Sequence, residues 1–158
     1  MDSNIHKWWV GSKSKKLVKN RELSNLYLDI SEEILKKLNQ DNNNNKLLFL
    51  MSIENSLSHL ADDIFDNFKN DLESIENLNY KYKWNELSNL KALRNIITKE
   101  LDPNGLINLI ETSKSIFFRE DDKNLIITTE INDLKKFNLI LDKYKAFKEL
   151  LRKTLDEC

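Results

Sequence analysis

The sequence predicts an all-α fold, an antiparallel bundle of about five helices. The 158 residues include only two glycines, Gly11 and Gly105, and one proline, Pro103. Sheet-rich and loop-rich folds need many such residues for tight turns and for backbone with positive φ. Apolar residues also recur at steps of three and four along most of the chain, which is the period of one helix face.

Length and composition favour one soluble globular domain over residues 1–158, with a basic N-terminal segment at 1–21. The chain is 40% hydrophobic and 32% charged, and charges of both signs are mixed along most of it. A chain of this length buries roughly 70% of its unfolded surface, so it can form a hydrophobic core without disulfides.

The first two helices are predicted at residues 20–39 and from Lys46 to about Glu76. The stripe of the first is Leu23, Leu26, Ile30, Ile34 and Leu38. The stripe of the second is Leu50, Ile53, Leu57, Leu60, Ile64, Phe68, Leu72 and Ile75. A second helix of that length would span about 45 Å, so it should kink or project beyond the bundle.

Residues 77–84 interrupt this stripe and are predicted to be a connection. A third helix should follow from Leu87 to Leu101, with a fourth from Pro103 to about Lys114. Asp102 suits the N-cap of the fourth helix, where its carboxylate would accept backbone N–H groups, and Pro103 suits the first turn.

The segment from Ser115 to Thr128 is ambiguous. It contains two short β-prone runs, Ser115 to Phe118 and Leu125 to Thr128, separated by six polar residues. They predict either a small hairpin or, as the favoured reading, a helix through Phe118 followed by an irregular loop. A final long helix is expected at about 129–156.

The sequence contains no recognisable catalytic or metal-binding pattern. His6 and His59 stand alone, and Glu54 is five residues from His59, which does not match the Glu-x-x-His spacing of helical di-metal sites. Cys158 is at the terminus with no histidine nearby, and the "GSKSKK" segment lacks the second glycine and the preceding strand of a phosphate loop. We therefore expect a protein that is not an enzyme and has no cofactor or metal.

Two stretches interleave aromatic and basic residues and are the candidate binding sites. Residues 1–21 hold six basic side chains and one acid, a charge of +5, which leaves −6 for the rest of a chain with net charge −1. The candidate residues of the two stretches are Trp8, Trp9, Lys13, Lys15, Lys16 and Lys19, and then Tyr80, Tyr82 and Trp84.

These stretches have three interpretations. Their aromatic rings could cap the helical core while the lysines remain solvated, which we favour. They could bind RNA or single-stranded DNA, with lysines attracting phosphates and aromatic rings stacking on bases. They could instead dock another protein.

At the level of function we expect a helical adaptor or complex subunit that binds a protein partner in an intracellular assembly, cytoplasmic or nuclear. The alternative is a nucleic-acid-binding module. The single cysteine excludes an intrachain disulfide and fits a reducing compartment. No stretch approaches 18 uninterrupted apolar residues, and the N-terminus has no apolar core of a signal peptide, so we expect neither a membrane span nor secretion.

Overall fold

The computed structural model describes residues 19–38, 43–117 and 126–157, with no account of the side chains of 126–133. These residues form six helices and contain no strand, which confirms the all-α class. The helices are α2 (Asn20–Lys36), α3 (Asn43–Asn67), α4 (Tyr80–Leu87), α5 (Arg94–Leu101), α6 (Leu106–Phe117) and α7 (Ile126–Asp156).

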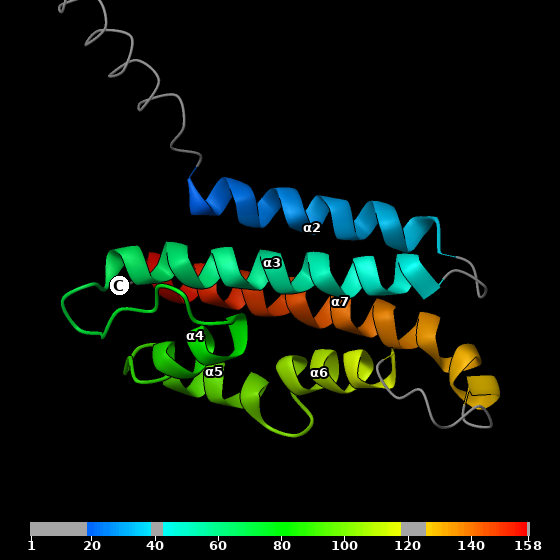
Figure 1. Cartoon of the computed structure of the whole chain (residues 1–158). Helices are drawn as coiled ribbons and strands as arrows, with labels where there is room; N and C mark the ends of the chain where they lie inside the picture. The colour runs from blue at the N-terminus through cyan, green and yellow to red at the C-terminus, as the bar shows by residue number, and fades with distance from the viewer. Residues whose placement is uncertain (1–18, 39–42, 118–125, 158) are drawn as a thin grey trace, which may run out of the picture.

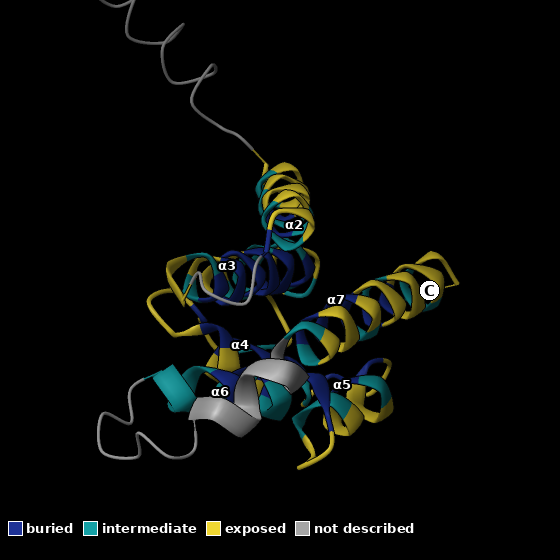
Figure 2. Cartoon of the chain, turned by 90° about the vertical axis from the view of Figure 1, so that its right-hand side faces the viewer, coloured by how far each residue is buried: buried dark blue, intermediate teal, exposed yellow. Residues whose placement is uncertain are grey.

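The helices form a bundle in which α3 and α7 occupy the middle. Figure 1 shows α2 lying along α3 in the opposite direction, while α3 and α7 run the same way. The short helices α4, α5 and α6 lie on the other side of α3 from α2 (Figure 2). Only one side of α2 is therefore covered by the rest of the bundle.

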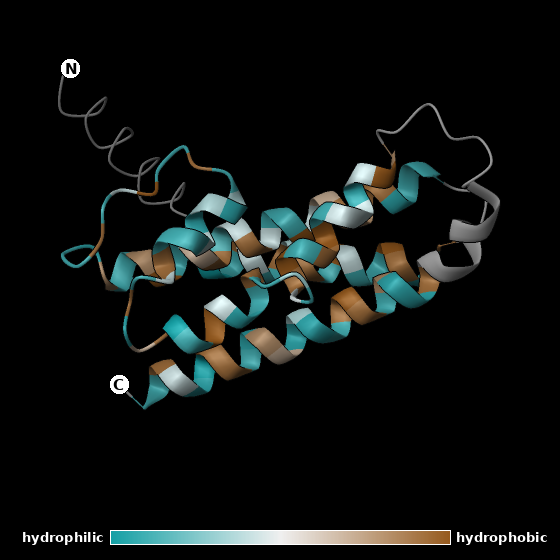
Figure 3. Ribbon diagram, turned by 90° about the horizontal axis from the view of Figure 1, so that it is seen from below, coloured by the Kyte–Doolittle hydropathy of each residue, from teal (hydrophilic) through white to brown (hydrophobic). Residues whose placement is uncertain are grey.

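The core is built mainly from α3, α4 and α7. Phe49 packs against Phe137 with ring centroids 5.1 Å apart, and Trp84 meets Phe147 edge-on at 5.0 Å. All four rings are almost fully buried. Apolar and polar residues recur in alternation along α7, as its amphipathic pattern requires (Figure 3).

The first helix begins at Asn20 as expected but ends at Lys36, and its buried face is not the expected one. Leu26 and Ile30 are 52% and 38% exposed, whereas Ser24 and Ser31 are fully buried. The hydroxyl of Ser56 donates to the backbone oxygen of Ser24 at 2.6 Å, so α2 turns its serines toward α3. Small side chains allow this close approach, and the larger apolar residues are rotated away.

The second helix is shorter than expected, because α3 ends at Asn67. The apolar spacing continues beyond that point, but residues 68–79 are not helical, and Asn77 adopts a φ of 66°. Asn70, Asp71 and Ser74 are weak helix formers that favour turns. Ile75 is nevertheless buried, so a residue at helical spacing joins the core from a loop.

The expected connection at 77–84 is wrong, since α4 begins at Tyr80. The side-chain oxygen of Asn79 accepts the backbone N–H of Tyr82 at 3.1 Å, which is an N-cap. The expected third helix is also divided, because α4 ends at Leu87, turns occupy 88–93, and α5 begins at Arg94.

Asp102 does not cap the fourth helix as expected. It ends α5, and the backbone N–H of Leu106 at the start of α6 is instead bound by the Glu100 carboxylate at 2.8 Å. Gly105 lies so close to Glu100 that an added Cβ would be 2.3 Å from the Glu100 carbonyl oxygen. The turn therefore requires glycine, and α6 starts three residues later than predicted.

The helical reading of residues 115–128 is confirmed where the structure describes them. Ser115 to Phe117 belong to α6 and Ile126 to Thr128 to α7, so the hairpin alternative is wrong for these residues. Residues 118–125 lie outside the described residues. The expected final helix is confirmed as α7, which begins three residues before Thr129.

Candidate partner-binding surfaces

The second basic-aromatic stretch contributes mainly to the core. Tyr80 is 6% exposed and Trp84 is fully buried, with its indole N–H donating to the Leu57 carbonyl oxygen at 3.1 Å. The Tyr80 hydroxyl donates to Glu111, and burial, reinforced by that carboxylate, raises the pKa of Tyr80. Tyr82 is the one aromatic ring of this stretch that is well exposed, at 59%.

Lys83 in the same stretch is also withdrawn from the surface. It is 7% exposed and its ammonium contacts the Asp62 carboxylate at 2.8 Å and the Ser58 hydroxyl at 2.9 Å. The positive charge is thus neutralised inside the molecule. Because the Lys83 ammonium is engaged in an ion pair with Asp62, we interpret this cluster as structural rather than as a catalytic serine–lysine pair.

The first basic-aromatic stretch lies almost wholly outside the described residues. Trp8, Trp9, Lys13, Lys15 and Lys16 fall there, so their binding role stays a prediction. Lys19 is exposed immediately before α2 and makes no side-chain cap.

Sequence neighbours of Lys19, Tyr82 and Trp84 line one pocket, although none of these three candidate residues does. Asn20, next to Lys19, and Lys83 both line a pocket of about 550 Å³. Its other charged residues are Asp62, Asp66, Lys69 and Glu76. Acids outnumber bases in this pocket, so its charge does not favour a phosphate backbone.

A different surface exposes large apolar side chains, which we call the α2–α3 apolar face. It consists of Leu26 and Ile30 from α2 and Leu48 and Met51 from α3, which are 38–52% exposed. Half-buried Leu23, Tyr27 and Ile34 adjoin them on α2.

Two sets of contacts fix where this face lies. On one flank of α2, Asn25 and Glu32 contact Lys148 and Lys145 of α7. On the other flank, Tyr27 stacks on His59 of α3 with ring centroids 5.6 Å apart and planes at 4°.

Helical geometry places the apolar face on the flank of Tyr27 and His59. Each residue advances about 100° around a helix, so Tyr27, Ile30 and Ile34 share one side of α2. Leu48 precedes His59 by eleven residues, about three turns, and so shares its side of α3. The face therefore lies on the flank of the α2–α3 pair that points away from α7.

The charges around this face are mostly acidic. Glu22, Asp29 and Glu33 are exposed along α2, and of these only Glu33 has an ion pair, with Lys36 at 3.1 Å, within the described part of the chain. Burial lowers the pKa of His59, so its imidazole is neutral at pH 7 and adds no positive charge. Lys36 and Lys37 lie at the end of α2, where Lys37 lines the same hollow as Ile30 and Ile34.

A shallow hollow of about 290 Å³ accompanies the apolar face. Ile30 and Ile34 supply its apolar wall. The polar lining consists of Asp29, Glu33, Lys37 and Asn45. We call it the α2 hollow.

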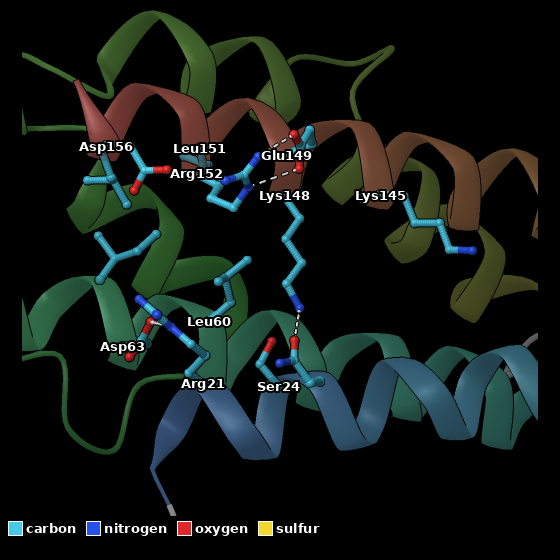
Figure 4. Close-up of a pocket in the computed structure, with 13 residues that line it drawn as sticks. Arg21, Ser24, Leu60, Asp63, Lys145, Lys148, Glu149, Leu151, Arg152 and Asp156 are labelled. Atoms are coloured by element: carbon cyan, nitrogen blue, oxygen red, sulfur yellow. Dashed lines mark hydrogen bonds and ion pairs between the residues drawn. The ribbon is translucent and has the colours of Figure 1, made fainter.

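The opposite flank of α2 carries a groove with basic residues along it. The groove has a volume of about 470 Å³ and an apolar floor of Leu60, Ile64, Leu151 and Leu155 (Figure 4). Its basic residues are Arg21, Lys145, Lys148 and Arg152, and its acids are Asp63, Glu149 and Asp156. Burial lowers the pKa of Lys148, whose ammonium donates to the Asn25 side-chain oxygen. Three of the four bases along this groove are paired with acids, Arg21 with Asp63, Lys145 with Glu32 and Arg152 with Glu149 and Asp156.

Among residues 19–38, 43–117 and 126–157, no three His, Cys, Asp or Glu side chains are grouped so that they could hold a metal ion. Within the same ranges no helix is both long and apolar enough to cross a bilayer. Compared with protein-family models, curated proteins and solved structures, the chain matches none.

Sequence reasoning missed the α2–α3 apolar face, although a signal was present. Leu26 and Ile30 were expected in the core because leucine and isoleucine are more hydrophobic than serine. Ser24 and Ser31 are seven residues apart, and with Leu28 and Leu35 they form a second stripe of helical period. That stripe is the one that packs.

Proposed function

We propose that this chain is a non-enzymatic helical adaptor that binds a protein partner in an intracellular assembly through the α2–α3 apolar face. The observation that carries the proposal is the exposure of four large apolar side chains on two adjacent helices. Single exposed apolar residues are common, but a contiguous group at the surface marks an interaction site.

The chemistry of the partner follows from the charges beside the face. Within the described residues Glu22 forms no ion pair, and Asp29 acts on Lys148 only through its charge, so a partner with lysine or arginine beside its apolar residues would complement them. An amphipathic helix supplies apolar anchors at steps of three and four, which suits a face formed by two antiparallel helices. We therefore assign a basic amphipathic helix as the partner segment.

The nucleic-acid alternative depends on residues outside the described part of the chain. In the described stretch, Tyr80 and Trp84 are buried and Lys83 is paired with Asp62, so these groups do not contribute to a basic surface. Binding through Trp8, Trp9 and the nearby lysines remains the competing hypothesis, and the experiment below separates the two.

The test is partner capture from native extract with matched variants. Leu26→Lys with Ile30→Lys places two charges on the face, and Leu139→Lys with Leu150→Lys makes the same change at two comparably exposed leucines of α7. We expect the wild-type and α7 variants to retain one protein after nuclease treatment, and the face variant to lose it at unchanged helicity. Release of all partners by nuclease would support nucleic-acid binding instead, and equal capture by all three proteins would contradict the proposal.

A further inference from the structure

We propose that α2 undocks from α3 and α7 as a unit while the rest of the bundle stays folded. The α2–α3 apolar face takes its residues from both helices, so it is complete only while α2 is docked. This control of partner access rests on the proposed function, but the undocking itself is tested without a partner.

α2 contributes little to the apolar core. Its two buried residues are serines, Ser24 and Ser31. Its apolar contacts with the core come from Leu28, Ile34 and Leu35, which are only partly buried. Burial of apolar surface is the main force that holds helices together. We therefore infer that α2 is held less strongly than α3 and α7, which bury large apolar side chains along their length.

The side of α3 that contacts α2 is a polar stripe. Its residues recur at steps of three and four and are Ser56, His59, Asp63 and Asp66. The Ser56 hydroxyl donates to the Ser24 backbone oxygen at 2.6 Å, and Asp63 pairs with Arg21 at 3.3 Å. The Arg21 side chain is 72% exposed, so this ion pair is at the surface.

The contacts between α2 and α7 are also polar. The Tyr144 hydroxyl lies 3.3 Å from that of Ser24, and Lys145 pairs with Glu32 at 2.8 Å. Lys148 donates to the Asn25 side-chain oxygen. Water replaces such contacts when they break, so each one contributes little net free energy to docking.

The remaining core does not need α2. Phe49 packs on Phe137 and Trp84 on Phe147, which joins α3, α4 and α7 to one another. α2 lies on the outside of the bundle, across α3 from the three short helices (Figure 2). Undocking of α2 uncovers one side of α3 and leaves both ring pairs in place. Openings of this kind require less free energy than global unfolding.

Undocking links the partner surface to the state of one helix. Leu26 and Ile30 leave with α2, whereas Leu48 and Met51 stay on α3. A partner that contacts both pairs binds only the docked state and therefore stabilises it.

Native-state amide hydrogen exchange of the full chain tests the undocking. We expect the protection factors of α2 to lie about tenfold or more below those in the middle of α3 and α7. The middle of α2 should be no better protected than its ends, and its exchange should accelerate in low concentrations of urea. Fraying from the ends would instead protect the middle and would respond little to urea, because it exposes little surface.

A core variant separates undocking from global unfolding. Phe147→Leu weakens the contact with Trp84 in the docked and the undocked state alike, so the protection of α7 should fall about tenfold. The protection of α2 should stay within about twofold of its wild-type value, because the ratio of docked to undocked protein is unchanged. Leu139→Ala, at an exposed position of the same helix, should alter neither.

Three results would overturn the inference. They are equal protection of α2 and α7 in the wild-type protein, an equal fall for both helices in Phe147→Leu, and the fraying pattern in α2. If one of these is found while Leu26→Lys with Ile30→Lys still abolishes partner capture, the inference fails and the proposed function stands. If α2 undocks but those substitutions leave capture unaffected, the proposed function fails and the undocking stands.

Discussion

At the scale of single residues, the position of an aromatic side chain on its helix determined whether it is buried, and its basic sequence neighbours did not. Tyr80, Trp84 and Leu87 are spaced by four and three residues and are all buried, so a helical stripe was present in "YKYKWNEL". The interleaved lysines made the stretch resemble a binding surface. The sequence could not show that Lys83 forms an ion pair with Asp62, since the two residues are 21 positions apart.

Trp84 and Tyr82 should respond in opposite ways to truncation. Trp84→Ala removes a fully buried ring and the hydrogen bond to Leu57, so we expect a loss of roughly 3–5 kcal/mol in the free energy of unfolding. Tyr82→Ala changes a ring that is 59% exposed and should alter stability by no more than about 0.5 kcal/mol. Urea denaturation measures both, and similar losses for the two variants would contradict the assignment of Trp84 to the core.

Tyr144 should make stability fall at alkaline pH. Its hydroxyl lies 2.7 Å from that of Ser56, and burial raises its pKa above the value of about 10 expected in the unfolded chain. Above that pH the unfolded chain releases the phenolic proton while the folded protein retains it. The unfolded state then binds fewer protons, so the free energy of unfolding falls by up to about 1.4 kcal/mol per pH unit.

The Tyr144→Phe variant isolates this contribution. Urea denaturation across the alkaline range should give a shallower decline with pH for the variant than for the wild-type protein, whatever the variant's stability at neutral pH. The pKa of Tyr80 is also raised, so the stability of Tyr144→Phe should still decline with pH. Adding Tyr80→Phe should make this decline shallower. Parallel declines for wild type and Tyr144→Phe would show that this hydroxyl ionises as readily in the folded protein as in the unfolded chain.

At the scale of elements, period and turn chemistry predicted most helices, but not their ends or their buried faces. The start of α2 at Asn20 was predicted correctly, but α2 ends at Lys36, before the expected residue 39, and α3 stops nine residues before Glu76. The end of α3 has no glycine or proline, so only weak preferences of Asn and Asp residues marked it. The face of α2 depends on how closely α3 approaches, which is a property of both helices together.

The contact between α2 and α3 predicts that changing a buried serine destabilises the protein more than truncating a leucine of the same helix. Ser24 is fully buried, and its hydroxyl lies 3.3 Å from those of both Ser56 and Tyr144. Ser24→Leu would force a large side chain into this space and should cost roughly 1–3 kcal/mol. Leu26→Ala should cost no more than about 0.5 kcal/mol, because Leu26 is half exposed. Thermal denaturation compares the stability of the two variants. A larger loss of stability for Leu26→Ala would show that α2 buries the stripe expected from hydrophobicity alone.

At the scale of the whole molecule, the all-α class was predictable because so few glycines and prolines leave little choice of chain path. The candidate surface was not predictable, since its two α2 residues, Leu26 and Ile30, belong to the stripe that the sequence pattern assigned to the core. α2 lies against α3 on one side (Figure 2) and contacts α7 through Glu32 and Asn25. Its Leu26 and Ile30 remain at the surface. A helix that exposes residues of core character is what an adaptor surface requires.

Site-specific photo-crosslinking tests the docking surface most directly. A photoreactive phenylalanine derivative is placed at Met51 on the α2–α3 apolar face or, as a control, at Leu150 on α7, two positions that are 45% and 48% exposed. After nuclease treatment of native extract, we expect Met51 to give a discrete protein adduct, which Leu26→Lys with Ile30→Lys abolishes, and Leu150 to give none. Equal adducts from both positions, or adducts to nucleic acid alone, would contradict the assignment of this face as the protein-binding surface.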